Sequence, residues 1–185
     1  SLFYANILTI FFGLFLSLFC FIYVIPFNRS KKNIRNHSRI KIFIVAFCWA
    51  SVTVLFPLTN ETDIDFLNSL LLFIQRFVFV IAYTIPFEIR DLKYDSLNLK
   101  TMPQVFGIKK TKKIALFLLS LFTLITLWLS PIILNYLISD LLIALIAGYL
   151  IWISRKNQTK YFASFWVESI PLIWLIIILL LKSIN

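Results

Sequence analysis

Long apolar runs recur along the whole chain. They lie at about residues 2–25, 40–57, 66–87, 114–130, 134–153 and 163–181, and Pro, Asn or charged residues border them. A helix needs about 20 mostly apolar residues to cross the ~30 Å hydrocarbon core of a bilayer, and each run approaches that length. Only 14% of the residues are charged, whereas a soluble domain has about 25%. The pattern predicts an all-α integral membrane protein, a single transmembrane domain made of a bundle of about six helices.

The prolines help to set the expected helix boundaries. Four of them, Pro26, Pro57, Pro86 and Pro131, lie at or near the ends of the apolar runs. A proline there does little harm, because its missing N–H and its clash with the preceding turn matter least at a helix end. Pro171 lies inside the last run, so the sequence predicts a kink in that helix.

The basic residues occupy alternate connections between the apolar runs. Residues 27–41, 88–113 and 154–162 hold every Lys and Arg except Arg76 and Lys182, and the connection before residue 66 is acidic. The positive-inside rule then places these three loops in the cytosol and both termini on the extracytoplasmic side. We expect the bacterial inner membrane as the location. The net charge of +10 comes from basic residues that lie next to the membrane, where they interact with anionic lipid. Nucleic acid is therefore not an expected partner.

Three carboxylates stand out in the otherwise basic loops. Glu88, Asp91 and Asp95 are the only acidic residues there, and their spacing places them on one face if the helix continues past Pro86. Like charges so close raise one another's pKa, and a cation relieves the repulsion. Mg²⁺ is commonly held by one or two carboxylates together with substrate phosphates. The spacing predicts a Mg²⁺ site at Asp91 and Asp95, supported by Glu88.

Cations in the same stretch suit the phosphate groups that would complete such a site. Arg90 offers a planar fork of donors, and Lys93 and Lys100 offer point charges, so we expect the three to bind a diphosphate. The alternative is an amphipathic loop whose mixed charges pair with one another and with water, since such surface pairs are common and weak. Spacing alone leaves both interpretations open.

The segment from Phe87 to Lys113, FEIRDLKYDSLNLKTMPQVFGIKKTKK, resembles the second aspartate motif of the UbiA superfamily of intramembrane prenyltransferases. In that family a D-x-x-D-x-x-x-D run at a cytosolic helix end precedes a T-L-P-type segment, a Gly and basic residues. The matching positions here are Asp91, Asp95, Thr101, Pro103 and Gly107, and Glu88 replaces the first Asp.

The resemblance implies that the six expected helices correspond to the last six of a nine-helix fold. The family's first motif, N-D-x-x-D-x-x-x-D, does not occur in these 185 residues, so we expect N-terminal helices that carry it to be missing from this sequence. The implied activity is Mg²⁺-dependent transfer of a prenyl group from a prenyl diphosphate to an aromatic or other lipophilic acceptor, with Asp91 and Asp95 as catalytic residues. The alternative is a catalytically degenerate relative that binds a lipid or a protein partner.

Three ionisable residues fall inside the apolar runs. An unpaired charge at mid-membrane is costly, so Arg76 is expected to form a structural ion pair with Asp140. Together with Glu168 the two could instead belong to a small-solute transporter, a third function. Glu168 either helps to bind the acceptor or is a buried acid bonded to a hydroxyl such as that of Ser164 or Tyr161, and both interpretations stay open.

Overall fold

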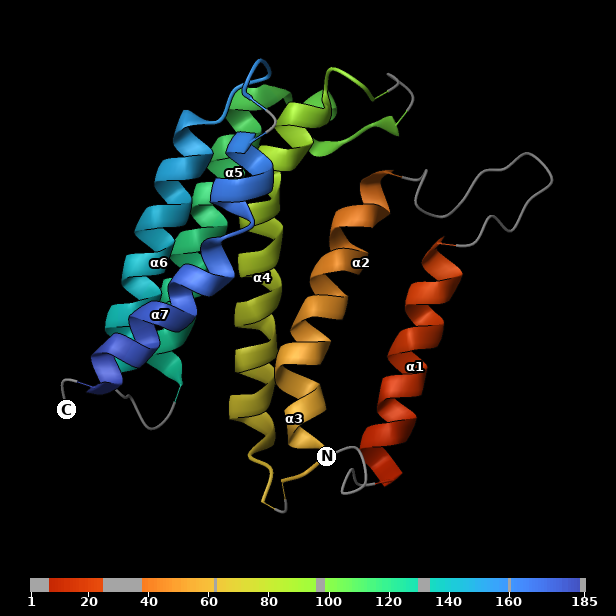
Figure 1. The fold of residues 1–185 in the computed structure, drawn as a ribbon, viewed down its shortest axis with the longest axis vertical. Helices are drawn as coiled ribbons and strands as arrows, with labels where there is room; N and C mark the ends of the chain where they lie inside the picture. The colour runs from red at the N-terminus through yellow and green to blue at the C-terminus, as the bar shows by residue number, and fades with distance from the viewer. Residues whose placement is uncertain are drawn as a thin grey trace.

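The computed structural model describes residues 7–24, 38–61, 63–95, 99–129, 134–159 and 161–183, and no strand occurs among them. Figure 1 shows the arrangement of the helices. Two short stretches of the described chain are π-helical. In chain order the elements are α1 (Ile7–Val24), α2 (Ser38–Ala50), η3 (Ser51–Leu55), α3 (Phe56–Leu58), α4 (Phe66–Asp91), α5 (Met102–Trp128), α6 (Leu134–Ile153), η5 (Phe162–Val167) and α7 (Ile170–Ser183).

Five stretches of the described chain are long and apolar enough to cross a membrane. They are Lys41–Leu58, Phe66–Asp91, Met102–Trp128, Leu134–Ile153 and Phe162–Ser183, and α1 adds the shorter apolar stretch Thr9–Leu18. The prediction of an all-α protein with membrane-spanning helices is confirmed. Many large apolar side chains on these helices are exposed, as expected for surfaces that face lipid.

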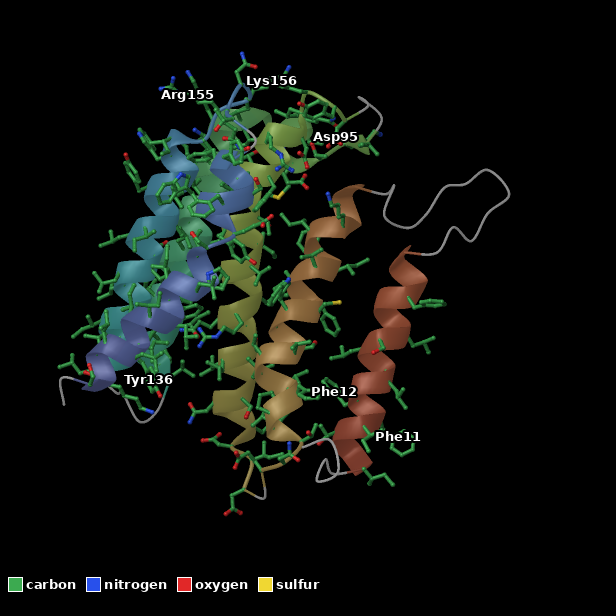
Figure 2. All side chains as sticks on the ribbon, in the orientation of Figure 1. Phe11, Phe12, Asp95, Tyr136, Arg155 and Lys156 are labelled. Atoms are coloured by element: carbon green, nitrogen blue, oxygen red, sulfur yellow. The ribbon has the colours of Figure 1, made fainter. Side chains whose placement is uncertain are left out.

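Helix α4 is the central element of the bundle. It packs against α2 on one side and against α5 on the other, and it also contacts α6 and η5. An aromatic cluster joins it to α5 and α7, because the ring of Phe79 lies 4.7 Å from that of Phe122 and 5.0 Å from that of Trp174. Helix α1 lies at the outer edge beyond α2 and contacts α3 through Phe12 and Phe56 (Figures 1 and 2).

The connections gather at two ends of the bundle. Both the α4–α5 connection and the α6–η5 connection lie at the end where α2 begins, whereas the α3–α4 connection lies at the opposite end (Figure 1). Figure 2 shows Asp95, Arg155 and Lys156 at the first of these ends. We call it the basic end. Most of the predicted 27–41 loop lies outside the described residues.

Two helix boundaries differ from those expected. Helix α4 does not end at residue 87 but continues to Asp91. Helix α5 begins at Met102 rather than at residue 114, so its predicted start is wrong. The basic residues before position 114 hid this start, although Lys is a good helix former. Thr101 marks it instead, since the Gln104 side chain accepts a hydrogen bond from the Thr101 N–H at 3.2 Å.

Gly107 divides α5 into a short first piece and a long second piece. Its backbone has φ 75° and ψ 156°, a conformation that residues with a Cβ rarely adopt. The T-x-P…G spacing therefore describes a capped helical turn, followed by a glycine break and then the membrane-spanning helix.

The last predicted helix is interrupted, as Pro171 suggested. The π-helical η5 ends at Val167, and α7 begins at Ile170 after a turn at Glu168 and Ser169. Pro171 then lies in the first turn of α7, where its missing N–H has no helical partner to lose. The helix is thus interrupted just before the proline at which the sequence predicted a kink.

Candidate functional site at the basic end

The end of α4 presents the three carboxylates predicted to form a site. The helix runs through Glu88 to Asp91, and the Asp95 N–H donates to the Asp91 carbonyl at 2.9 Å, which adds one more helical turn. The backbone is therefore helical past Pro86, as the spacing argument requires. All three carboxylates lie close enough to interact electrostatically.

Glu88 is the buried member of this group. Only 7% of it is exposed, and it lines a hollow of about 230 Å³ between α2 and α4. Lys41 of α2 lines the same hollow and provides a positive charge for both Glu88 and Asp95. Lys41 falls where the expected 27–41 loop overlaps the expected 40–57 helix. Its position directly at the start of an apolar run was the signal that could have placed it beside the acids.

Asp91 accepts a hydrogen bond from Arg90 Nε at 2.8 Å. The two side chains are 24% and 26% exposed, so solvent screens this pair and it contributes little to stability. Within the described part of the chain, Arg90 makes no second hydrogen bond. Four of the five N–H groups of its guanidinium are therefore not used in a hydrogen bond to the described residues.

A second hollow, of about 310 Å³, lies on the other side of Arg90 and Asp91. Its lining residues are Arg90, Asp91, Lys93, Tyr94, Gln158 and Ser164. We call it the α4–α6 loop hollow, since Gln158 belongs to the connection after α6. The structure thus brings Arg90, Lys93 and Asp91 together. Lys100 is exposed and lines neither hollow.

Asp95 lies at the margin of the site, outside the membrane-spanning stretch of α4. Burial raises its pKa above the ordinary value, and the neighbouring negative charge of Asp91 raises it further, while Lys41 partly offsets both effects. A raised carboxyl pKa beside a second carboxylate indicates a position where a bound cation would be stabilising.

The residues fit a shared metal ion better than a complete protein cage. Within the described ranges, no group of three or more His, Cys, Asp or Glu side chains is close enough to hold a metal. Glu88, Asp91 and Asp95 therefore do not form a three-carboxylate site on their own. Two carboxylates completed by phosphate oxygens and water is a usual environment of Mg²⁺, and Asp91 and Asp95 suit it.

The expected ion pair in the bundle interior has a different geometry from the one predicted. Arg76 Nη1 donates to Gln75 Oε1 at 3.0 Å, and Gln75 Nε2 donates to Asp140 Oδ2 at 3.0 Å. Thr126 Oγ1 also donates to Asp140 Oδ2, at 2.8 Å. The expected pair is corrected: Arg76 and Asp140 interact through Gln75 and not by direct contact.

The guanidinium of Arg76 also lies over the Trp174 ring, 4.1 Å from its centroid. This cation–π contact links α4 to α7 and compensates part of the charge. The network therefore joins α4, α5, α6 and α7 inside the bundle. Its bonded groups form a single cluster and not a chain of titratable sites across the membrane, which supports a structural role.

Glu168 lies in the turn between η5 and α7 and is exposed. The interpretation as a buried acid bonded to a hydroxyl is therefore wrong. Glu168 interacts electrostatically with Tyr83 of α4. A role in acceptor binding stays a prediction.

Comparisons of the chain with models of known families, with curated proteins and with solved structures found no match.

Proposed function

We propose that this protein binds a prenyl diphosphate with Mg²⁺ at the basic end and transfers the prenyl group to a lipophilic acceptor, as a UbiA-like prenyltransferase. One observation carries the proposal: Asp91 shares the α4–α6 loop hollow with Arg90 and Lys93, and Asp95 follows one helical turn later. Metal-binding and phosphate-binding side chains thus occupy one helix end.

The position of this helix end suits an amphiphilic substrate. The α4 stretch from Phe66 to Asp91 is long and apolar enough to cross a membrane, so the carboxylates lie at its polar boundary. A diphosphate head group would bind there, and the prenyl tail would extend along apolar side chains. The exposed aliphatic and aromatic surface of the helices offers such an environment.

Each residue of the site has a distinct part in the proposed reaction. Asp91 and Asp95 would hold Mg²⁺, and Arg90 and Lys93 would bind the phosphate oxygens. When bound, Mg²⁺ supplies Lewis-acid stabilisation of the negative charge on the diphosphate. Arg90 and Lys93 act in the same direction, because fixed positive charges stabilise the leaving group as its bond to the prenyl carbon breaks. Glu168 is proposed on the acceptor side.

We also propose that the basic end faces the cytosol of a bacterial cell, across the inner membrane. The support is the placement of the positive charges. Arg155 and Lys156 lie with the α4–α5 connection at the basic end, and Asp63 and Asp65 lie in the connection at the opposite end (Figures 1 and 2).

A second function, binding of a lipid or a partner without catalysis, also has an observation in its favour. Glu88 stands where the family motif has Asp, and it is buried beside Lys41 and lines the other hollow, between α2 and α4. A carboxylate engaged there contributes less to a metal site. Transport of a small solute is the third candidate. It has little support, because Asp140 is engaged by the hydrogen bond from Gln75 in a single cluster.

A transfer assay separates catalysis from binding. Membranes that contain the full chain are incubated with Mg²⁺, tritiated geranyl diphosphate and a lipid extract as the source of acceptor. We expect radiolabel in an organic-soluble product that is distinct from geraniol, and we expect its loss with EDTA and in the Asp91→Asn variant. Diphosphate binding without labelled product would instead support the non-catalytic function.

A further inference from the structure

Gln158 connects the loop after α6 to α4. Its Nε2 donates to the Pro86 carbonyl at 2.9 Å, and its Oε1 accepts a hydrogen bond from the Arg155 N–H at 3.0 Å. Both ends of one side-chain amide are therefore used, one on the loop and one on the neighbouring helix. Pro86 lies one helical turn before Arg90, so this bond fixes the loop against the turn that carries Arg90 and Asp91.

The same loop is fixed at its beginning by α5. Lys112 Nζ donates to the carbonyls of Trp152 and Ser154, both at 2.6 Å. The ammonium group of Lys112 thus lies beside the C-terminus of α6, where its positive charge also suits the partial negative charge of the helix end. The loop is thus fixed at two points, by Lys112 where it leaves α6 and by Gln158 where it passes α4.

The two described cations of the loop, Arg155 and Lys156, do not line the α4–α6 loop hollow. Arg155 and Lys156 are exposed and extend outward from the basic end in Figure 2, whereas Gln158 lines the hollow beside Arg90 and Asp91. The loop contributes to the hollow through a neutral amide. Arg155 and Lys156 lie where salt screens their effect on a bound anion.

We propose that Gln158 is a positioning residue for the diphosphate pocket: its hydrogen bond to the Pro86 carbonyl holds the loop as a wall of the hollow lined by Arg90, Asp91 and Lys93. This inference rests on the proposed function, because it names that hollow as the place of the diphosphate. It assigns the role of the loop to a neutral side chain rather than to Arg155 and Lys156.

The first arm of the test measures the affinity for inorganic pyrophosphate and for geranyl diphosphate, with Mg²⁺ at physiological ionic strength, for the full chain in nanodiscs. Gln158→Met keeps the length of the side chain and removes both hydrogen bonds. We expect its dissociation constants for both ligands to rise about fivefold, the effect of one hydrogen bond. Asn157→Ala, an exposed neighbour, is the matched control and should bind as the wild type does.

The double variant Arg155→Gln, Lys156→Gln tests the competing explanation. We expect its affinity to change by less than about twofold, because both charges are screened. If this variant loses more affinity than Gln158→Met, the loop acts through charge and the inference is overturned. It is also overturned if Gln158→Met binds both ligands as the wild type does.

The second arm does not depend on ligand binding. Hydrogen–deuterium exchange of residues 154–159 should be about fivefold faster in Gln158→Met than in the wild type, with no change in Asn157→Ala and no change of Tm in either. Unchanged exchange would show that the amide does not fix the loop. If the wild type binds neither diphosphate, both the proposed function and the positioning role are refuted. Faster exchange in Gln158→Met would then show only that the amide fixes the loop.

Discussion

Gln75 lies between Arg76 and Asp140, and its side-chain amide donates to the Asp140 carboxylate at 3.0 Å and accepts from the Arg76 guanidinium at 3.0 Å. An amide can serve both charges at once, because it carries a donor and an acceptor on the same group. The two charges of the bundle interior are thus compensated without direct contact, and Thr126 provides the second donor to Asp140.

Replacing Gln75 should destabilise the bundle. Gln75→Leu leaves the Arg76 guanidinium without its hydrogen bond and Asp140 with one donor fewer, and we expect a loss of about 1 to 2 kcal/mol in the free energy of unfolding. Denaturant unfolding in mixed micelles measures it. Ser120→Ala is the control, since this exposed hydroxyl bonds only within its own helix, to the Phe117 carbonyl. Equal stability of the two variants would show that the network is not structural.

Gly107 should be intolerant of a side chain, although there is space around it. An added Cβ would meet nothing within 4 Å, so the cost of Gly107→Ala comes from the backbone, with φ at 75°. We expect a loss of about 1 to 3 kcal/mol, the cost of a residue held in such a conformation. Gly148→Ala is the matched control: it lies within α6 and its Cβ would be 3.4 Å from a Leu116 methyl, so thermal stability should not fall. A larger loss at Gly148 would contradict this account.

The pH dependence of stability should change when Asp95 is replaced. Burial and the charge of Asp91 raise the pKa of Asp95, so the folded protein holds this proton more tightly than the unfolded chain does, where the value is about 3.9. Its stabilising contribution is present below about pH 4 and is lost as the pH rises through the raised value. Asp95→Asn should therefore gain Tm relative to the wild type from pH 4 to pH 7.

Lys41→Met provides the companion measurement. Lys41 opposes the rise of the Asp95 pKa, so removing it should make the fall of Tm with pH steeper than in the wild type. A wild-type profile that matches Asp95→Asn at every pH would show that Asp95 does not titrate as the structure indicates.

The orientation of the bundle is testable by cysteine labelling. In a background with Cys20→Ala and Cys48→Ala, Asp63→Cys places a thiol at one end and Lys156→Cys places a thiol at the basic end. A membrane-impermeant maleimide should label Asp63→Cys in intact spheroplasts and Lys156→Cys only after permeabilisation. The opposite labelling would place the basic end outside the cell.

The sequence predicted the helical class and most of the spans, because a helix that crosses lipid must be apolar over its whole length. The polar stretches were harder to predict. Helix α5 begins at Met102, well before its apolar run, since Thr101, Gln104 and Gly107 set that boundary through local hydrogen bonding and backbone conformation.

The site was predicted in part. The argument from the spacing of Glu88 and Asp91 required the helix to continue past Pro86, and α4 does so as far as Asp91. Neither Lys41 nor Gln158 was predicted, because each reaches α4 from a distant part of the chain. Gln75 was missed for another reason. Arg76 and Asp140 were expected to be in direct contact, whereas the uncharged Gln75 bonds to both.

The most direct test of the proposed function is Mg²⁺-dependent binding of a prenyl diphosphate to the full chain. Wild type, Asp91→Asn and Asp95→Asn are compared by titration with geranyl diphosphate, and Asp63→Asn, an exposed acid at the opposite end, is the control. We predict that the wild type and Asp63→Asn bind equally, and that Asp91→Asn, Asp95→Asn and removal of Mg²⁺ each weaken binding at least about tenfold. Equal binding by all four proteins, with or without Mg²⁺, would contradict the account.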